Sequence, residues 1–530
     1  MSIGVPTLVS SRSHPRALLT ALHEAAVQGA APFARTRDAV HAWWEAQALP
    51  PALDAPVYLI ALGKAAPAMA AGAVAALAER RTTVTGGLVV AAHLPATHEW
   101  HGLPVPELLQ IMQGDHPVPG PRSLAAADAI DDLLQAMVPD ALVLVLLSGG
   151  TTALCAAPIT SLSQMVGSAE AAQAMLANLA QTLLESGLAI HEMNAIRRRV
   201  LRFGAGRLAT ALAARGTRTI ATFAISDVIG DDPAVIGSGP CSPDPLDDAT
   251  FLALLDAHDM RARLQRAMAQ VLGLAGSGAP PAVSPATHPA FTRVHYTLVA
   301  RNADAVQALA RAASDAGFAH VQVDATPLEG DAAALGDLLA RRGMALARTL
   351  PAGETALLVA GGEPVVHLRE TIERALQASD EDEARRADEL AADLSAEFVA
   401  DGESPAPPTG AHRPSRPTAV ADEPLRGGRM QVLALAASLV LEQAVARGER
   451  HASRVILLAA GTDGRDGPTD AAGAIVDAAV PALARRAMRA PEEDLLTGRS
   501  WYSLDGADAL LRTGPTGTNV MDVVAVCVRG

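Results

Sequence analysis

A recurring order of short apolar run, glycine turn and alanine-rich segment constrains the fold of this chain more than any other feature. Residues 57–62 (VYLIAL) are apolar at every position, Gly63 follows them, and residues 65–78 are rich in alanine. Residues 142–147 (LVLVLL) form a second such run, which ends at a Ser-Gly-Gly turn. Strands that are apolar on both faces are typical of parallel sheets covered by helices. The pattern therefore predicts an α/β fold with right-handed crossovers.

The alternation of strands and helices continues along the chain and is interrupted twice. A stretch rich in Gly, Pro, Ser and Ala predicts a linker at 276–292, between an N-terminal α/β domain at 12–275 and a C-terminal α/β domain at 293–530. A charged and proline-rich stretch predicts a polar, partly disordered insertion at about 370–426. Both sheets are expected to be mostly parallel. Two helices are expected before residue 50, further strands at 88–92, 219–225, 296–300, 321–323, 355–360, 455–459 and 523–528, and further helices at 304–316, 331–346, 431–446 and 471–487.

Composition excludes several classes of function. The chain has 42 basic and 57 acidic residues, a net charge of −15, which disfavours nucleic-acid binding because phosphate backbones are repelled. Its 3 cysteines are far apart and favour neither a disulfide framework nor a zinc site. The sequence predicts no signal peptide and no membrane span. A cytoplasmic protein without a membrane partner is the expectation.

Lysine has been replaced by arginine at every position but one. Of the 42 basic residues, Lys64 is the single lysine. Arginine serves most surface and ion-pair roles, but it does not reproduce a compact ammonium group among phosphate oxygens. Because Lys64 directly follows Gly63 at the end of a predicted strand, we interpret it as a functional residue.

Three glycine-containing turns predict anion binding. Glycine lets the backbone approach a phosphate, and the helix that follows offers N–H groups and a positive partial charge. The first turn is Gly63-Lys64, and the others lie at 148–152 and 514–519. The candidate binding residues are Gly63, Ser148, Gly149, Gly150, Thr151, Thr152, Gly514, Thr516, Gly517, Thr518 and Asn519.

The common nucleotide fingerprints are missing from these turns. No GxxxxGK[ST] sequence occurs, and the GxGxxA string at 204–209 follows a predicted helical segment instead of a strand. This absence disfavours the hypothesis that the chain is a nicotinamide-dependent oxidoreductase.

Carboxylates follow two of the predicted strands. Asp227 comes directly after the strand at 219–225 and is a candidate Mg²⁺ ligand or base, whereas Asp231 and Asp232 are interpreted as turn and cap residues. Asp463 occupies the corresponding place after the strand at 455–459. Asp470 is interpreted as the N-cap of the helix expected at 471–487.

Two further residue types are candidates for a smaller role. Arg429 opens a predicted helix after two glycines, where it can clamp a carboxylate or a phosphate with two hydrogen bonds. His93, His98, His101 and His116 show no spacing for metal ligation and are interpreted as loop histidines. His116 differs from the others because prolines follow it closely in GDHPVP.

Eight sequence blocks follow one another in a fixed order along the chain. They are ALGKAAPAM (61–69), GDHPVP (114–119), LLSGGTTAL (146–154), ISDVIGDDPAVIGSGP (225–240), GGEP (361–364), GGR (427–429), GTDGRDGPTDAAGAIVD (461–477) and GPTGTNVMD (514–522). In this order they resemble the glycerate 2-kinases that carry a C-terminal MOFRL domain, a class also labelled hydroxypyruvate reductase. The resemblance covers nearly the whole chain except the insertion.

The resemblance implies two α/β domains with the active site in the cleft between them, and ATP- and Mg²⁺-dependent phosphorylation of D-glycerate at its 2-hydroxyl. It implies that Lys64, Asp227, Arg429 and Asp463 are catalytic. Phosphoryl transfer depends mostly on positioning and charge neutralisation. Lys64 would then stabilise the transferring phosphate, and Arg429 would hold the glycerate carboxylate or a phosphate. Either Asp227 or Asp463 would hold Mg²⁺ or accept the 2-hydroxyl proton.

The sequence departs from the family pattern at several positions. Thr151 and Thr152 stand where the family has smaller residues, and Met430 stands where it has asparagine. Gly204 replaces a lysine, Arg198 a lysine and Arg199 a histidine, and Met521 stands where asparagine is common. Two alternative functions stay open: a hydroxypyruvate reductase that uses NAD(P)H, and a degraded, non-catalytic relative.

Overall fold

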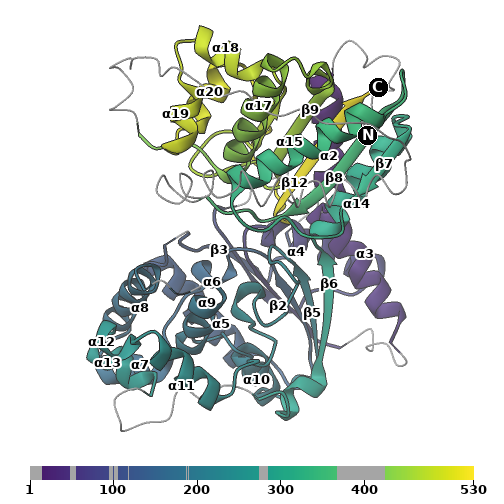
Figure 1. Cartoon of the computed structure of the whole chain (residues 1–530). Coiled ribbons are helices and arrows are strands. Elements are labelled where there is room, and N and C mark those ends of the chain that lie inside the picture. Colours follow the sequence, from purple (N-terminus) through teal and green to yellow (C-terminus); the bar gives the residue numbers. More distant parts are fainter. Residues whose placement is uncertain are drawn as a thin grey trace. The chain divides into compact units, whose positions relative to one another are not determined.

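A computed structural model of the chain describes residues 15–47, 55–94, 100, 105–116, 118–186, 188, 190–273, 285–366 and 424–530. These residues form two compact units, each built on a six-stranded sheet (Figure 1). The parallel-sheet unit contains Ala30–Arg301 and Gly517–Val520. The mixed-sheet unit contains the described residues up to Gly29, Asn302–Thr516 and Met521–Gly530. The α/β class predicted from the sequence is confirmed.

The sheet of the parallel-sheet unit has the strand order β3-β2-β1-β4-β5-β6, and all of its pairs are parallel. The order reverses between β1 and β4, which lie side by side at the centre. In open α/β sheets, ligands bind at the carboxyl ends of the strands next to such a reversal. The strands are β1 (Val57–Leu62), β2 (Gly86–Ala91), β3 (Leu109–Gln113), β4 (Leu142–Leu147), β5 (Thr219–Ile225) and β6 (Val294–Ala300).

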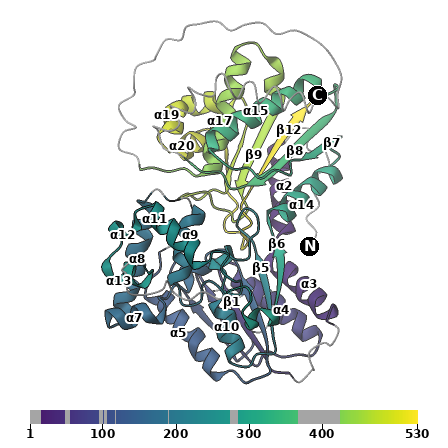
Figure 2. The ribbon, with the colours of Figure 1, turned by 60° about the horizontal axis from the view of Figure 1, so that its bottom comes forward.

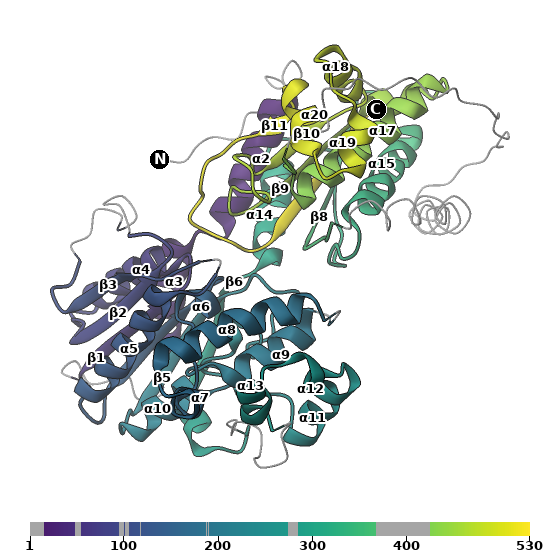
Figure 3. The same cartoon turned by 90° about the vertical axis from the view of Figure 1, so that its left-hand side faces the viewer.

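Helices cover both faces of this sheet. Its strands β1, β2 and β4 are consequently buried at every position. Tyr58, Ile60 and Leu62 of β1 pack in a cluster with α5 and α10, while α3 and α4 pack on the opposite face. A separate hydrophobic cluster is formed by α7, α8, α9, α11, α12 and α13, which are seen together in Figure 3. The helices are α3 (Pro32–Glu45), α4 (Ala66–Glu79), α5 (Pro121–Ala136), α6 (Thr151–Leu154), α7 (Thr160–Val166), α8 (Ala169–Leu184), α9 (Ile190–Val200), α10 (Arg207–Ala214), η2 (Ile236–Ser238), α11 (Asp248–Ala257), α12 (Met260–Arg263), α13 (Arg266–Val271) and η3 (Pro289–Arg293).

The mixed-sheet unit has the strand order β11-β10-β9-β12-β8-β7. Only β7 and β8 are parallel, and the pairs from β8 to β11 are antiparallel. The expectation of a mostly parallel second sheet is therefore wrong. The physical reason is that the C-terminal strand inserts between β8 and β9 and runs opposite to both. The strands are β7 (His320–Val323), β8 (Thr355–Gly362), β9 (Val455–Gly461), β10 (Gly473–Val476), β11 (Leu510–Leu511) and β12 (Asp522–Arg529).

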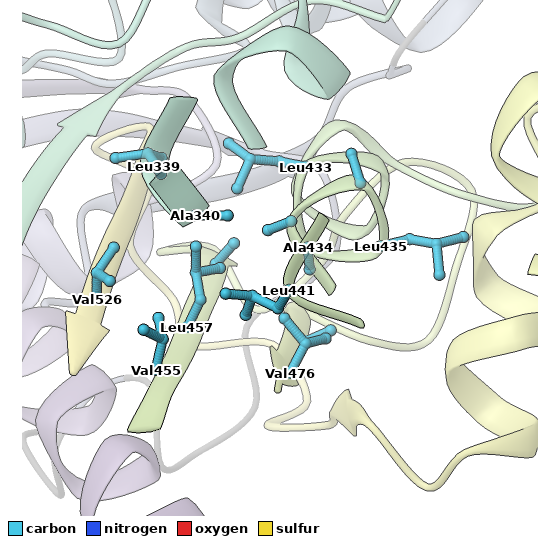
Figure 4. Packing of buried hydrophobic residues seen from close by; sticks show 14 of the residues in the cluster. Leu339, Ala340, Leu433, Ala434, Leu435, Leu441, Val455, Leu457, Val476 and Val526 are labelled. Atoms are coloured by element: carbon cyan, nitrogen blue, oxygen red, sulfur yellow. The ribbon is translucent and has the colours of Figure 1, made fainter. Parts of the chain in front are cut away.

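Two pairs of helices cover the two faces of the mixed sheet (Figure 2). One face carries α2 and α14, and the other carries α15 and α17. The second pair packs on alternate residues of β9 and β12, including Leu457 and Val526 (Figure 4). The helices are α2 (Pro15–Gly29), α14 (Asn302–Asp315), α15 (Ala332–Thr349), α17 (Arg429–Ala446), η4 (Arg450–Arg454), α18 (Val480–Arg486), α19 (Pro491–Leu496) and α20 (Ser500–Gly506).

The expected domain boundaries differ from the observed units. The strand expected at 296–300 in the C-terminal domain is β6, which pairs with β5 in the parallel sheet. The helix at 15–29, expected in the N-terminal domain, packs on α14 in the mixed-sheet unit. Residues 274–284 of the expected linker and most of the expected insertion, 370–423, lie outside the described residues.

The helical segment expected at 471–487, kinked or split at Pro481, is wrong in its first part and present in its last. Residues 473–476 form β10, which pairs with β9, and α18 begins only at Val480. The alanine-rich composition suggested a helix, but an available strand edge on β9 determines the structure. Asp470 is consequently not a helix N-cap and instead accepts hydrogen bonds from Arg512 and Trp501.

Helix α17 is the hydrophobic centre of the mixed-sheet unit. Among the described residues it is the one helix that is long and apolar enough to cross a bilayer, and most of that stretch is buried in the protein core. Its backbone comes very close to α15, because a β-carbon on Gly336 would lie 2.2 Å from the carbonyl oxygen of Leu433. Only glycine fits at this crossing.

Replacing Gly336 with alanine is expected to lower the free energy of unfolding by about 1–3 kcal/mol, since α15 and α17 must separate to admit the methyl group. Denaturant unfolding at several probe wavelengths would measure this. Arg341→Ala on the exposed face of α15 is the control, and it should change stability by less than about 0.5 kcal/mol. A Gly336→Ala protein as stable as the control would contradict the close packing of the two helices.

Candidate active site

The lone lysine and the Ser-Gly-Gly turn lie together at the reversal point of the parallel sheet. Leu62 at the end of β1 pairs with Leu147 at the end of β4, so both turns leave the sheet at the same edge. The backbone N–H of Lys64 donates to the carbonyl of Gly149 at 2.9 Å. Gly63 has a φ of +127°, and a β-carbon there would lie 2.2 Å from Oγ of Ser148. The two predicted anion turns therefore form one structural unit.

Polar side chains surround the two glycines of the second turn. A β-carbon on Gly149 would lie 1.9 Å from Oδ2 of Asp227, so the carboxylate rests directly against the turn. Nδ2 of Asn519 donates to the same Oδ2 at 3.1 Å. A β-carbon on Gly150 would lie 3.2 Å from Cγ of Lys64. The structure thus brings Lys64, Asp227 and Asn519 together around residues 149–150, and anion binding there stays a prediction.

The hydroxyl groups of this turn form hydrogen bonds with other protein groups and so stabilise the turn. Oγ of Ser148 accepts the N–H of Ala65 at 3.1 Å, and Oγ1 of Thr151 donates toward the carbonyls of Leu62 and Ser148, each at 2.8 Å. Thr152 shares a hydrogen bond of 2.9 Å with Ser238. The threonine at 151 is buried and turned into the protein, so it stabilises the turn without crowding its outer face.

A second group of candidate residues lies in the mixed-sheet unit around Arg429. Nε of Arg429 donates to Oδ2 of Asp522 at 2.5 Å, and Nη1 donates to Oε1 of Glu363 at 3.0 Å. Burial alone would lower the pKa of Arg429, but the charges of Asp522 and Glu363 raise it above its usual range. Arg429 is therefore a permanent cation, and Nη2 is the guanidinium nitrogen that these two carboxylates do not engage.

Asp463 contributes a half-buried carboxylate to this group. A β-carbon on Gly461 would lie 3.2 Å from Oδ1 of Asp463 and 3.3 Å from Oδ1 of Asp522, which places both carboxylates beside the end of β9. The carbonyl of Asp463 accepts the N–H of Thr516 at 3.3 Å. The structure therefore joins Asp463 and the start of the Gly514–Asn519 segment to Arg429.

The Gly514–Asn519 segment is divided between the two units. Thr516 donates from Oγ1 to the carbonyl of Thr462 in the mixed-sheet unit. Residues Gly517–Val520 belong to the parallel-sheet unit. There Thr518 donates from Oγ1 to the carbonyl of Ala30 at 2.9 Å. Gly514 and Gly517 both have positive φ, which explains the glycines of this block. Binding of phosphate or substrate by this segment stays a prediction.

Asp522 and Glu363 were not singled out as candidates. Glu363 stands in the GGEP block after β8, and Asp522 is the first residue of β12. They meet at Arg429 only because β12 pairs with β8, in the register that sets Asp522 opposite Gly362. The strand order carries this information, whereas the local sequence does not.

Asp466 caps helix α17 from a distance in sequence. Its carboxylate accepts the N–H groups of Met430 at 3.2 Å and Gln431 at 2.8 Å, where the helix dipole favours negative charge. Burial nevertheless raises the pKa of Asp466 to about 7, and the charge of Asp522 acts in the same direction. Burial likewise raises the pKa of Asp522 to about 6, against the opposing effect of Arg429.

These raised pKa values predict an unusual pH dependence of stability. Between about pH 4 and pH 7 folded Asp466 keeps a proton that the unfolded chain has released, so the free energy of unfolding falls as pH rises through this window. For one proton the slope is at most about 1.4 kcal/mol per pH unit. Asp466→Asn should therefore remove about 1 kcal/mol per pH unit from the slope between pH 5 and pH 6.5.

Denaturant unfolding at half-unit steps of pH would measure that slope. Asp315→Asn, at the exposed end of α14, is the control and should keep the wild-type profile. An Asp466→Asn protein whose stability changes with pH like the wild type would show that Asp466 is ionised throughout.

The remaining predicted residues have structural roles. Asp232 accepts the N–H of Ala234 at 2.9 Å, which confirms its interpretation as a turn residue. Asp231 adopts a φ of +55° and lies 3.6 Å from Arg301. The segment 204–206 precedes α10 and follows α9 and an isolated bridge, so the GxGxxA string does not open a helix after a sheet strand.

The described residues form no metal site from protein side chains alone. They contain no group of three or more His, Cys, Asp or Glu side chains placed to hold a metal ion by themselves. Mg²⁺ commonly takes only one or two protein carboxylates and completes its shell with water and substrate phosphates. Asp227 and Asp463 each fit that description, so their role as metal ligands stays a prediction, as does an active site shared by both domains.

Comparisons with known proteins identify the family of the chain. Residues 18–273 match the family model described as "Domain of unknown function (DUF4147)", and residues 418–522 match the MOFRL family. The chain is 31% identical to the glycerate kinase of Homo sapiens over 491 residues, which covers 89% of this chain and 84% of the human one. It is 27% identical to the D-glycerate 2-kinase of Thermotoga maritima over 472 residues, covering 88% and 89%.

Two further comparisons extend this result. A protein of Agrobacterium vitis named as a candidate hydroxypyruvate reductase is 29% identical over 476 residues, with 89% and 86% of the two chains covered. The crystal structure of the Thermotoga maritima glycerate kinase superposes with a TM-score of 0.67 at 24% identity, covering 96% of this chain and 98% of that chain. The superposition supports the fold.

Proposed function

The chain belongs to the glycerate kinase family, and on that premise we propose that it is an ATP-dependent kinase that phosphorylates D-glycerate at the 2-hydroxyl. The products are 2-phosphoglycerate and ADP. The observation that carries the proposal is the meeting of Lys64 with residues 148–152 at the reversal point of the parallel sheet, where Asp227 also lies. An anion-binding turn, one ammonium group and one carboxylate are the parts that phosphoryl transfer requires.

Each group has a role that follows from its chemistry. Lys64 neutralises charge on the transferring phosphoryl group, and the turn at 148–152 places backbone and helix N-terminus against phosphate oxygens. Arg429, held by Asp522 and Glu363, offers its remaining guanidinium nitrogen to the glycerate carboxylate or a phosphate. The Gly514–Asn519 segment binds phosphate or substrate in the same proposal.

Mg²⁺ belongs to the proposal as a companion of ATP. Asp227 and Asp463 are the carboxylates that would hold it, and when bound it would neutralise charge on the nucleotide phosphates. Asn519 donates to Oδ2 of Asp227, so one carboxylate oxygen is oriented by the protein. The aspartate that does not bind metal is the candidate acceptor of the 2-hydroxyl proton.

The cellular setting follows from the same proposal. D-glycerate is the small-molecule partner, and the acidic balance of −15 gives no reason to expect a nucleic-acid partner. The proposed location is the cytoplasm, without a membrane partner.

A coupled assay tests this function directly. Purified protein is supplied with ATP, Mg²⁺ and D-glycerate, and enolase without mutase reports 2-phosphoglycerate as it forms. We expect an enolase signal that requires both ATP and D-glycerate. ATP consumption that needs added mutase for an enolase signal would show phosphorylation at the 3-hydroxyl.

The two alternative functions are tested in parallel. A second cuvette contains NADH and hydroxypyruvate, because the strand order of the parallel sheet is shared with dinucleotide-binding sheets and one relative bears the reductase name. Oxidation of NADH without kinase activity would establish the reductase. Nucleotide binding without turnover in either cuvette would establish the non-catalytic relative.

A further inference from the structure

His116 lies beside the same turn as Lys64. It follows β3, and a β-carbon on Gly150 would lie 3.1 Å from Cδ2 and 3.2 Å from Nε2 of its imidazole. The same β-carbon would lie 3.2 Å from Cγ of Lys64. The imidazole and the lysine side chain therefore both contact the space above Gly150, immediately before the first turn of α6.

The backbone of His116 is fixed by its neighbours. Gly114 packs on α6, because a β-carbon there would lie 2.3 Å from the carbonyl of Leu154. Asp115 accepts the backbone N–H of Arg122 at 2.8 Å and pairs with its guanidinium at 2.7 Å. Ser123 accepts the N–H of Asp115 at 3.2 Å. These contacts with the start of α5 hold the imidazole toward the turn.

The charge of Lys64 beside His116 favours binding of an anion next to the imidazole over protonation of the imidazole. Lys64 faces it from the turn after β1, Asp227 lies beside the neighbouring Gly149, and Asp115 is neutralised by Arg122. Burial lowers the pKa of His116, and the charge of Lys64 lowers it further. The ring is therefore neutral at neutral pH, and a neutral imidazole carries one N–H that can donate to a phosphate oxygen.

We propose that His116 binds the phosphoryl group on which Lys64 acts, by donating a hydrogen bond from Nε2 to one of its oxygens. The inference rests on the proposed kinase function, because it assigns the anion of that site. A hydroxyl base is the less favourable role, since the adjacent ammonium group makes the ring a weak base. In this proposal Lys64 contributes positive charge, and His116 contributes a directional hydrogen bond that orients the phosphoryl group.

Kinetics of two variants separate binding from structure. His116→Ala removes the donor and should lower kcat about 10- to 100-fold with D-glycerate and ATP. His116→Gln keeps an N–H donor and should retain most of the activity. His258→Gln, in an ion pair with Glu192 in the helical part of the same unit, is the control and should match the wild type. Circular dichroism shows whether each variant is folded.

A spectroscopic titration with inorganic phosphate and with ADP supplies a readout that does not depend on turnover. The imidazole resonances of His116, assigned by their loss in His116→Gln, should shift on addition of phosphate. This shift should disappear in Lys64→Ala, whereas the signals of His258 should not move in either protein. Where both His116 variants are equally slow, this titration decides.

The outcomes distinguish the two proposals. Unmoved His116 resonances, or a His116→Ala enzyme as fast as the wild type, would overturn the role of His116 even if the wild type makes 2-phosphoglycerate. Phosphate-dependent resonances in a protein without kinase activity would support the anion contact and overturn the proposed function instead.

Discussion

Replacing Lys64 with alanine is expected to lower kcat at least about 100-fold, the usual effect of removing one preorganised charge from a transition state. The backbone of Lys64 is fixed before substrate arrives. Its backbone N–H is tied to Gly149, and the glycine before it has a φ that other residues rarely adopt. Alanine fits the same backbone, so the variant should fold. Steady-state kinetics in the enolase-coupled assay would measure the loss.

Lys64→Arg is the sharper variant, because it keeps the charge and changes only its shape. The stem of Lys64 runs close to Gly150, where the imidazole of His116 borders the same space. A planar guanidinium is larger than an ammonium group and presents its donors in a fixed fork, so we expect it to be poorly active as well. Arg215→Lys, at an exposed position after α10, is the matched control and should be fully active.

Either variant can contradict the assignment. An alanine variant with near-normal kcat would remove Lys64 from the mechanism. A fully active arginine variant would show that the positive charge alone is needed. It would contradict the inference drawn from Lys64 being the single lysine.

Two of the strands that the sequence predicted with exact bounds are buried at every position. The runs 57–62 and 142–147 became β1 and β4 with unchanged bounds, because short apolar runs that end at glycine-containing turns are typical of strands covered on both faces. Strand β3 was missed because it lies at the sheet edge and carries two glutamines in LQIMQ. Strand β10 was misread because alanine and glycine leave the choice to tertiary pairing.

The candidate site shows the same division. Lys64, residues 148–152 and Asp227 each follow a predictable strand, and parallel strands bring their carboxyl ends to one edge. Arg429 was predicted, but its partners Asp522 and Glu363 depend on the antiparallel insertion of β12, which no local pattern indicates. His116 follows the edge strand that the sequence did not reveal.

Three positions at which the sequence analysis noted departures lie where backbone conformation or packing restricts the side chain. Met521 adopts a φ of +65°, a conformation that asparagine tolerates better than most other residues. Met430 is fully buried in the core of the mixed-sheet unit. Gly204 lies so close to the carbonyl of Arg198 that a β-carbon would be 2.5 Å from it.

Arg199, a further departure, has become a buried structural cation. Its side chain is fully buried, with Nε 3.0 Å from Asp244 and Nη1 2.6 Å from Asp248, and its guanidinium lies 4.2 Å from the ring centre of Phe251. Nη2 donates to the carbonyl of Leu246. These contacts fasten α11 and the segment before it to α9, and none of them involves the Lys64 turn.

Replacing Arg199 with leucine is therefore expected to lower the free energy of unfolding by about 3–5 kcal/mol, because the fully buried carboxylate of Asp244 loses one of its two arginines. Arg37→Ala, which breaks an exposed pair with Asp38 in the same unit, is the control and should cost less than about 1 kcal/mol. At temperatures where the leucine variant is still folded, its KM for D-glycerate should equal that of the wild type. A raised KM in a protein of normal stability would instead place Arg199 in substrate binding, because a residue that only holds α9 to α11 and the segment before it cannot change affinity without weakening the fold.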